Sequence, residues 1–279
     1  MTIDAHHHVW DLSIRDQDWI TGPELQPLRR NFTLADLAPE ARAADVTGTV
    51  LVQTVTVPEE TPELLALAAT HDLVAGVVGW TDLTRPDLAD TLARLRALPG
   101  GRYLKGIRHQ VQGEPDPGWL LRPDVRRGLT VLAAAGLAYD LVVLPHQLPA
   151  CVEAAATHPE LLFVLDHLGK PPLASGALQP WAADLRALAA RPNTLAKLSG
   201  LPTEADPASW TTDELRPYVD TALDAFGPAR LMFGSDWPVC TLAGTYGEML
   251  DAARELTASL SPEERAEVFG GTATRAYGL

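Results

Sequence analysis

Short apolar runs alternate with helix-like segments along the whole of this chain. Eight runs are predicted to be β-strands, at residues 2–9, 48–54, 74–80, 104–110, 137–144, 161–169, 194–200 and 230–237. Most of them lead into a polar stretch and then into apolar residues at helical spacing. Several are apolar throughout rather than at every second position, which is typical of strands buried on both faces of a parallel sheet.

The segments between the runs are predicted to be helices because their apolar residues recur every three or four positions. They cover residues 61–71, 85–98, 124–136, 180–190, 214–227 and 261–277, with a less clear helix around 34–44. Strand–helix alternation repeated eight times in 279 residues predicts an α/β fold, a single (β/α)8 TIM barrel that forms one domain over residues 1–279. The alternative is a doubly wound open sheet, which is disfavoured because no glycine-rich phosphate loop follows any strand.

The charge of the chain restricts its partners. Lys and Arg number 22 against 36 Asp and Glu, so the net charge is −14. Such a surface repels phosphate backbones and anionic lipid, and we expect no nucleic-acid or membrane partner. Two distant cysteines do not make a disulfide framework, and there is no signal-peptide pattern or membrane-length apolar run, so a cytoplasmic protein is expected. A homo-oligomer stays open.

Polar side chains gather at the ends of the predicted strands, where barrel enzymes carry their active sites. Six of the eight histidines fall at or just after a strand end. In strand order, the polar or aromatic residues there are His6, His7 and His8; Gln53; Trp80 and Asp82; Arg108, His109 and Gln110; Asp140 and His146; Asp166, His167 and Lys170; Lys197 and Ser199; and Ser235, Asp236 and Trp237.

The first and last strands suggest one shared site. Side chains alternate faces along a strand, so His6 and His8 point the same way, about 7 Å apart, and His7 points the other way. Strands 1 and 8 are neighbours in a closed barrel, which places Asp236 beside the two imidazoles. Two histidines and a carboxylate suit a divalent ion of the zinc type, or a carboxylate base oriented by imidazoles.

Each of these residues also has a structural explanation when it is taken alone. Among the histidines, His7 would face the helices and His167 could be a core histidine. Arg108 and His109 could pair with surface acids, and Lys197 could be an inward group bonded to a neighbour. Among the acids, Asp140 could bond between barrel layers, Asp236 could cap a turn, and Asp166 would point away from His167. Taken together these explanations fail, because too many polar groups would have to gather at one end of one barrel.

Five ordered sequence blocks add a resemblance to a known family. IDAHHHVWDL, KGIRHQVQ, DHLGKP, KLSGL and LMFGSDWPVC resemble the amidohydrolase superfamily. The similarity covers essentially the whole chain. It is closest to the branch of amidohydrolase-related sugar-lactone hydrolases, and the L-fuconolactonase-like members are the most similar.

The resemblance implies a lactonase, a hydrolase of carbohydrate catabolism that opens an aldonolactone to the aldonic acid with water. Asp236 would be the general base, and His6, His8 and His167 would complete the catalytic set. Substrate contacts would come from Arg108, His109, Asp140, Trp10, Trp19 and Trp237, since a cation can stabilise the oxyanion and an indole can stack on a sugar ring.

The resemblance leaves the metal open. Either no metal is required, or one divalent cation, expected to be zinc, is held by His6, His8, His167 and Asp236. A second metal is not expected, because strand 4 ends in His109 rather than a bridging Lys or Glu, and strand 5 carries Asp140 rather than a histidine. Zinc lowers the pKa of water from about 15.7 to about 7, and a lactone needs that help less than an amide does.

Two other functions remain as alternatives. One is a mononuclear metal-dependent amidohydrolase or decarboxylase on the same barrel. The other is a non-catalytic sugar-binding protein, which has no reason to keep His6, His8 and Asp236 together.

Overall fold

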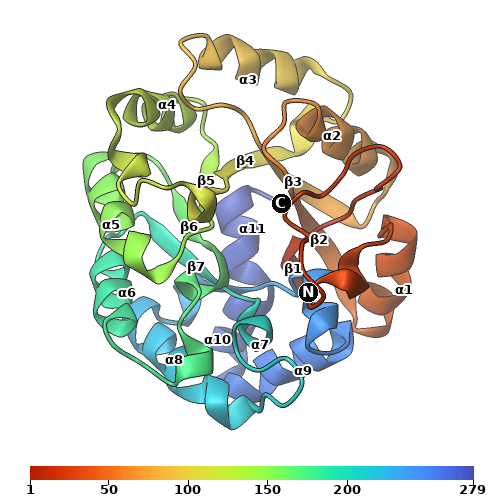
Figure 1. The fold of residues 1–279 in the computed structure, drawn as a ribbon, viewed down its shortest axis with the longest axis vertical. Helices are drawn as coiled ribbons and strands as arrows, with labels where there is room; N and C mark the ends of the chain where they lie inside the picture. Colours follow the sequence, from red (N-terminus) through yellow and green to blue (C-terminus); the bar gives the residue numbers. More distant parts are fainter.

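Eight parallel strands form one sheet whose neighbours follow the order of the chain. The computed structural model describes residues 1–279. The strands are β1 (Thr2–His7), β2 (Val46–Val52), β3 (Val74–Gly79), β4 (Leu104–His109), β5 (Ala138–Leu141), β6 (Phe163–Leu165), β7 (Thr194–Leu198) and β8 (Leu231–Phe233). Figure 1 shows the helices as a ring around these strands. The predicted (β/α)8 TIM barrel is confirmed: seven strands lie inside their predicted runs, and β2 overlaps the run 48–54 but begins two residues earlier.

The barrel closes between β1 and β8 through few backbone contacts. The amide of Asp236 donates to His6 O over 2.8 Å, and the amide of His8 donates to Trp237 O over 2.6 Å. Below them the buried carboxylate of Asp4 accepts from the Ser235 amide at 2.8 Å and from the Ser235 hydroxyl at 2.6 Å. At this junction, therefore, hydrogen bonds from a side chain replace part of the backbone hydrogen bonding that normally joins two neighbouring strands.

Helices cover the outside of the barrel. They are α1 (Leu34–Ala43), α2 (Glu60–Thr70), α3 (Leu88–Ala97), α4 (Pro123–Ala134), α5 (Leu148–Thr157), α6 (Trp181–Ala189), α7 (Leu201–Glu204), α8 (Thr212–Phe226), α9 (Tyr246–Leu256), α10 (Pro262–Ala266) and α11 (Thr272–Tyr277). None of them combines the length and the apolar character that a bilayer-spanning helix requires.

Three helices fall outside the predicted set, and one prediction is wrong in detail. The helices α5, α7 and α9 were not predicted, although Thr245 and Glu248 form a capping box before α9 that is visible in the sequence. The segment 261–277, predicted as one helix, is divided into α10 and α11 by a π-turn at Glu267–Gly271. Gly270 allows this turn to approach Met1, since a Cβ there would lie 2.5 Å from Met1 O.

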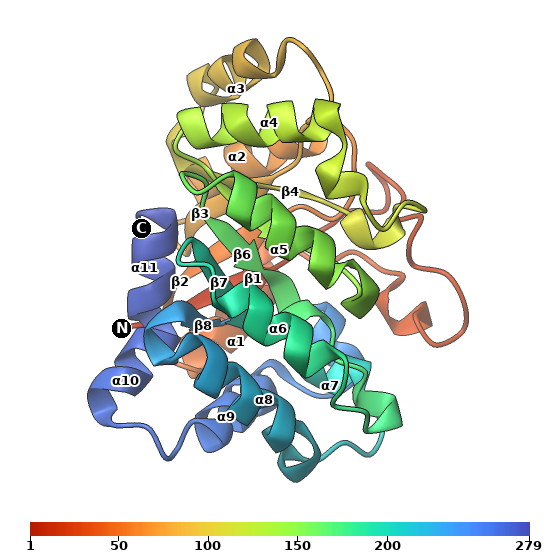
Figure 2. The same cartoon turned by 90° about the vertical axis from the view of Figure 1, so that its left-hand side faces the viewer.

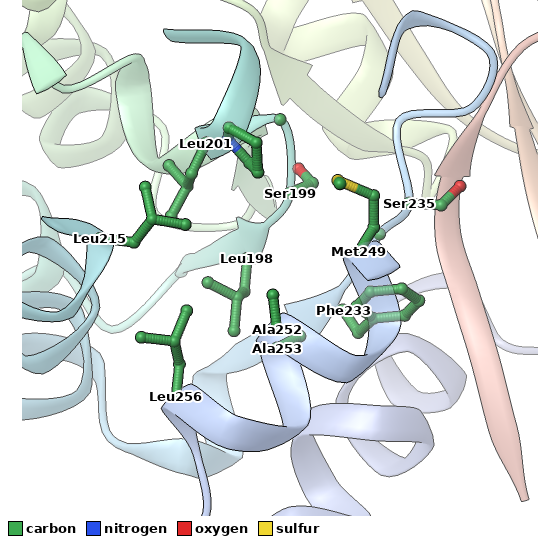
Figure 3. Close-up of a pocket in the computed structure, with 13 residues that line it drawn as sticks. Leu198, Ser199, Leu201, Leu215, Phe233, Ser235, Met249, Ala252, Ala253 and Leu256 are labelled. Carbon is green, nitrogen blue, oxygen red and sulfur yellow. The ribbon is translucent and has the colours of Figure 1, made fainter. Parts of the chain in front are cut away.

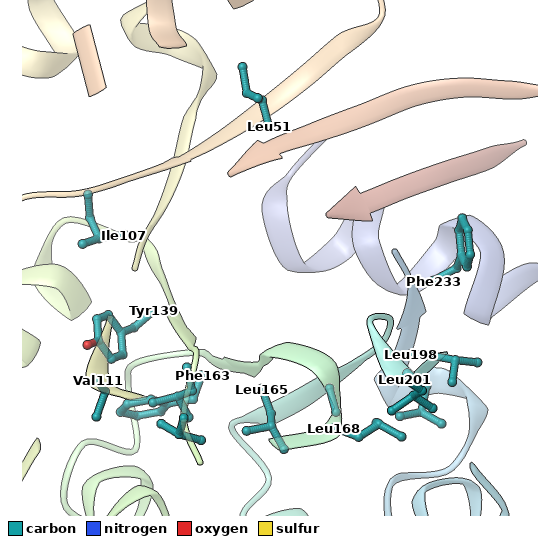
Figure 4. Close-up of a cluster of buried hydrophobic side chains, with 14 of the residues drawn as sticks. Leu51, Ile107, Val111, Tyr139, Phe163, Leu165, Leu168, Leu198, Leu201 and Phe233 are labelled. Carbon is teal, nitrogen blue, oxygen red and sulfur yellow. The ribbon is translucent and has the colours of Figure 1, made fainter. Parts of the chain in front are cut away.

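The core has two layers. The larger lies between the strands and the helices, and Figure 4 shows Leu51, Ile107, Tyr139, Phe163 and Phe233 within it. A smaller cluster inside the barrel includes Ile3, Val50 and Met232, and Ala273 and Tyr277 of α11 complete it. In Figure 2, α11 lies at the end of the barrel where the chain begins. The strand ends with their polar residues therefore lie at the opposite, open end.

Candidate active site

Two histidines from the end of β1 face each other at the open end of the barrel. His6 Nε2 and His8 Nε2 are 3.1 Å apart, and their ring centroids are 4.8 Å apart. His7 turns to the other side, where its Nε2 lies 2.9 Å from Thr49 Oγ1 of β2. The alternation expected along this strand places His6 and His8 together and leaves His7 in a structural contact.

Asp236 and His167 join these two imidazoles from the ends of β8 and β6. Asp236 Oδ1 lies 3.7 Å from His6 Nε2 and 3.5 Å from His8 Nε2. The rings of His6 and His167 have centroids 4.6 Å apart. The structure thus brings the four predicted catalytic residues into one buried cluster.

The backbone that presents Asp236 and His167 is left-handed. Asp236 has φ of +58°, and the four residues His167–Lys170 have φ of +52°, +51°, +71° and +52°. Such a conformation costs roughly 1–2 kcal/mol for each residue other than glycine. Strain of this kind concentrates at functional sites. In the sequence only Gly169 indicates this turn.

The far nitrogens of two histidines are fixed by oxygen atoms. His8 Nδ1 lies 2.8 Å from the carbonyl oxygen of Val52, and His167 Nδ1 lies 2.9 Å from Ser199 Oγ. A carbonyl can only accept a hydrogen bond, so a neutral His8 carries its proton on Nδ1. Its Nε2 then offers a lone pair to the cluster.

The Nδ1 atom of His6 has both a donor and an acceptor beside it. Lys197 Nζ lies 3.2 Å away, and Asp166 Oδ1 lies 3.3 Å away. If Nδ1 donates to Asp166, Nε2 is free to bind a metal. If Nδ1 accepts from Lys197, Nε2 can donate to His8 instead. The surroundings of His6 are therefore compatible with a metal-bound and with a metal-free site.

Arg108 of β4 reaches the same cluster. Its Nη1 donates to Asp166 Oδ2 at 3.0 Å and lies 3.3 Å from His6 Nε2. Its Nη2 donates to Gln53 Oε1 at 2.9 Å and to the Gln53 carbonyl. The guanidinium is held rigidly beside His6, at the wall of the cavity described below.

Asp166 is a site residue that the sequence interpretation placed wrongly. It was expected to point away from His167, but its carboxylate contacts His6, Arg108 and Lys197. Strand alternation stops at Leu165, because the left-handed turn begins directly after Asp166. Asp166 and His167 can therefore face the same cluster. Lys197 is an inward-facing residue bonded to its neighbours, as expected.

Asp140, a predicted substrate-binding residue, lies away from the cavity. It is fully buried, and its Oδ2 accepts from Lys197 Nζ at 2.5 Å and from the Tyr277 hydroxyl at 2.8 Å. Tyr277 comes from α11 at the closed end of the barrel, so Asp140 belongs to the barrel interior. The structure supports the bond between barrel layers that the sequence left open as an alternative.

His109, also predicted to bind substrate, faces the helix layer. Its ring stacks on Trp119 with centroids 4.2 Å apart, and its Nε2 lies 2.7 Å from Glu114 Oε1. Arg108 and His109 are consecutive in β4 and must take opposite faces. Since Arg108 is turned inward, His109 is turned away from the cavity.

Of the three predicted stacking tryptophans, only Trp19 reaches the cavity. Trp10 is buried, and its indole Nε1 donates to Arg30 O at 2.8 Å. Trp237 is buried edge-on against Phe32, with centroids 5.5 Å apart. Trp10 and Trp237 both pack against Phe32, and neither lines this cavity.

A cavity of about 280 Å³ opens above the cluster. His8, His167, Asp236 and Arg108 form part of its wall. Its other lining residues are Trp19, Leu25, Thr54, Gln110, Gln112, Val142, Lys170, Thr203, Glu204, Val239 and Leu242. The chemical groups thus line a space of the size of a small polar molecule.

Two other cavities lack this chemistry. A groove of about 530 Å³ lies between the segment after β1 and α2, and it is larger, but none of the clustered histidines lines it. A space of about 30 Å³ lies between β7, β8 and α9, as Figure 3 shows with Leu198, Phe233 and Met249. It is too small for a substrate.

Burial and neighbouring charges set the protonation of the cluster. Burial lowers the pKa of His6 and His167, which keeps both imidazoles neutral. Burial alone would raise the pKa of Asp236, but the nearby imidazoles of His167, His8 and His6 outweigh burial and hold this pKa well below the usual value. An ionised carboxylate therefore lies among the imidazoles of the cluster.

The donor set fits one divalent cation. The nearest donor atoms of His6, His167 and Asp236 all lie within 4.8 Å of one another. Neutral imidazole and carboxylate are zinc ligands. The far nitrogens of the three imidazoles also have partners of the kind that orient metal-binding histidines: a carboxylate, a hydroxyl and a carbonyl.

Known proteins resemble this chain along its full length. The sequence pattern of the family described as "Amidohydrolase" matches residues 3–279. An L-fucono-1,5-lactonase of Burkholderia multivorans is 42% identical, with 100% of this chain and 96% of that protein covered. An L-fucono-1,5-lactonase of Burkholderia ambifaria is 40% identical, with 99% and 94% covered.

A solved structure agrees at the level of the fold. An amidohydrolase from Burkholderia multivorans with bound zinc superposes with a TM-score of 0.95 at 41% identity, covering 100% of this chain and 99% of that one. A structure of an amidohydrolase from Burkholderia multivorans with bound HEPES superposes with a TM-score of 0.94 at 40% identity. It covers 100% of this chain and 99% of that one.

Proposed function

This chain belongs to the amidohydrolase family, and we propose that it is a lactonase that opens the ring of a neutral sugar lactone to give the aldonic acid. Two of its full-length relatives are L-fucono-1,5-lactonases. The observation that carries the proposal is the ionised carboxylate of Asp236, within 3.7 Å of His6 and His8 at the wall of a cavity whose lining includes the amides of Gln110 and Gln112 and the hydroxyls of Thr54 and Thr203.

Asp236 acts as the base in this proposal. It takes a proton from water as the water oxygen attacks the lactone carbonyl carbon. The ring C–O bond then breaks, and the proton passes from Asp236 to the departing alkoxide oxygen. His6 and His8 hold the carboxylate and the water in line. General-base catalysis of this kind contributes about 10²- to 10⁴-fold.

Arg108 stabilises the oxyanion that forms on the carbonyl oxygen. Asp166 and Gln53 fix its guanidinium in place before substrate arrives. A donor that needs no reorganisation stabilises developing charge most effectively.

A divalent ion, if it binds, would be held by His6, His167 and Asp236, with His8 beside them. Zinc is the natural candidate, since a relative at 41% identity was solved with it. Such an ion would polarise the lactone carbonyl or lower the pKa of a water molecule.

A lactone screen tests the function. D- and L-aldonolactones are offered to the purified protein, and acid release is followed with a pH indicator, with and without a chelator. We expect saturable hydrolysis of at least one neutral sugar lactone. Ligand binding without acid release would contradict the proposal and support a non-catalytic sugar-binding protein. Activity only on amides or aromatic acids would also contradict it and support a metal-dependent amidohydrolase or decarboxylase.

A further inference from the structure

The cavity contains an ion pair that the chemistry above does not use. Lys170 Nζ donates to Glu204 Oε1 at 2.7 Å, and both residues line the cavity. Their side chains are 22% and 28% exposed, so the pair lies at the mouth rather than among the buried catalytic groups.

The backbone directs Lys170 into this position. Lys170 ends the left-handed turn that begins at His167. One turn brings both residues to the cavity wall, although Lys170 itself has an unfavourable φ of +52°. Glu204 is the last residue of the short helix α7, which follows β7. Two separate strand–loop junctions thus meet in this pair.

The charges around the cavity are balanced before substrate enters. Its lining contains two permanent cations, Arg108 and Lys170, and two carboxylates, Asp236 and Glu204. Arg108 is already paired with Asp166 at 3.0 Å. Lys170 is already paired with Glu204. A carboxylate on a substrate would find both cations already paired with acidic side chains, and the molecule as a whole carries a charge of −14.

The remaining polar lining suits the hydroxyl groups of a sugar. Thr54, Gln110, Gln112 and Thr203 offer uncharged donors and acceptors.

We propose that the Lys170–Glu204 pair determines which substrate charge the enzyme accepts. Glu204 neutralises the cation at the cavity mouth, and this makes the enzyme reject lactones that carry a carboxylate. This inference rests on the proposed lactonase function.

The test compares two lactones of the same ring and configuration. For L-galactono-1,4-lactone, the partner is the galactaro-1,4-lactone that carries a carboxylate in place of the terminal hydroxymethyl group. We expect the wild-type protein to favour the neutral lactone by about a hundredfold in kcat/KM, as expected for an unpaired carboxylate near a like charge. If the wild type hydrolyses no neutral lactone, the lactonase proposal fails, whatever the variants do.

The informative variant is Glu204→Gln, which keeps the shape of the side chain and removes its charge. We expect kcat/KM for the anionic lactone to rise about tenfold or more, mainly through a lower KM, and the gain to shrink with added salt, because an exposed ion pair is screened. The double variant Lys170→Gln/Glu204→Gln should lose the gain, since it lacks the cation that binds the carboxylate.

Glu63→Gln is the matched control. Glu63 pairs with Arg15 at 2.9 Å in the groove of about 530 Å³ beside α2. Removing its charge should leave the ratio of kcat/KM for the neutral lactone to kcat/KM for the anionic lactone unchanged. An unchanged ratio in Glu204→Gln would overturn the inference. So would an equal gain in the double variant, or a loss of neutral-lactone activity without any gain on the anionic lactone.

Discussion

Gly200 lies where the two candidate catalytic side chains leave no room for a larger residue. Its φ is +63°, and a Cβ there would lie 2.6 Å from His167 Nδ1 and 3.1 Å from Asp236 Oδ2. It follows Ser199, which holds the same imidazole. The position of His167 therefore depends on a residue that has no side chain.

We expect Gly200→Ala to lower kcat about 10- to 100-fold, because a displacement near 1 Å in an active site has an effect of this size. The matched control is Gly136→Ala. Gly136 has the same φ of +63° but no atom within 4 Å of the added Cβ. Both variants should lose about 1–2 kcal/mol of stability from the backbone conformation. Equal kcat values in the two variants would contradict the crowding that we describe.

Asp140 gives the fold a pH dependence. Burial, the largest effect, raises its pKa to about 6, above the model-peptide value of 3.8, although Lys197 acts in the opposite direction. Between about pH 4 and pH 6 the folded protein therefore keeps a proton that the unfolded chain has lost. Stability from this group is present below pH 4 and declines as the pH rises through 6, by at most about 1.4 kcal/mol per pH unit.

Asp140→Asn cannot titrate, so the difference in unfolding free energy between wild type and variant should change across this window. Urea unfolding at several pH values from 4 to 7 measures it. A constant difference over the whole range would show that Asp140 keeps an ordinary pKa in the fold.

Single residues also show where sequence reasoning works. Alternation along β1 placed His6 and His8 on one side and His7 on the other, because a regular strand obeys that rule. The same rule misplaced Asp166, since the chain leaves the strand there in a left-handed turn. It could not decide between Arg108 and His109, because alternation says that they oppose each other without saying which faces inward.

At the scale of elements, the junction of β1 and β8 holds the catalytic pair together. Asp4 accepts hydrogen bonds from the His6 amide at 3.1 Å, the Tyr246 hydroxyl at 3.1 Å, and both the amide and the hydroxyl of Ser235. One carboxylate thus ties the first strand to the last strand and to α9. His6 and Asp236 lie directly beside this clamp.

Asp4→Ala leaves these buried donors without their acceptor. We expect a loss of about 3–5 kcal/mol of stability, since each unsatisfied buried group costs about 1–3 kcal/mol and some donors will find other partners. Denaturant unfolding measures the change. Asp206→Ala, at an exposed loop, serves as control and should cost less than about 1 kcal/mol. If the two variants are equally stable, the closure of the barrel does not depend on Asp4.

Two of the three unpredicted helices, α5 and α7, lack a clear signal in the sequence. The helix α5 begins with Leu148 and Pro149 and has no side-chain cap, and it follows a predicted strand that extended to residue 144. Pro145 marks the end of the strand, but no capping residue marks the start of the helix. Short elements such as α7 carry too few residues for a periodic pattern, yet α7 supplies Glu204 to the cavity.

At the scale of the whole molecule, the barrel follows from the repeated alternation of strands and helices. That pattern predicts neighbouring strands, and so it predicts that Asp236 lies beside His6 although the two are far apart in the sequence. The pattern does not predict how deeply a side chain is buried. Asp140, Trp10 and Trp237 come from the right strand ends, but Asp140 is bonded to Tyr277 of α11 and the two tryptophans are buried against Phe32.

The cluster of Asp236, His6, His8 and His167 is the central claim, and one comparison tests it most directly. The kcat/KM of Asp236→Asn is measured on the best neutral lactone and compared with wild type and with Asp45→Asn. Asp45 has nearly the same left-handed backbone, with φ of +57°, but lies at an exposed helix–strand junction. Asparagine tolerates this conformation, so both variants should fold. We predict a fall of about 10³-fold for Asp236→Asn, within the range of a lost general base, and no change for Asp45→Asn. A folded Asp236→Asn protein that keeps kcat/KM within a factor of about three, far less than the loss of a base would cause, would contradict the account.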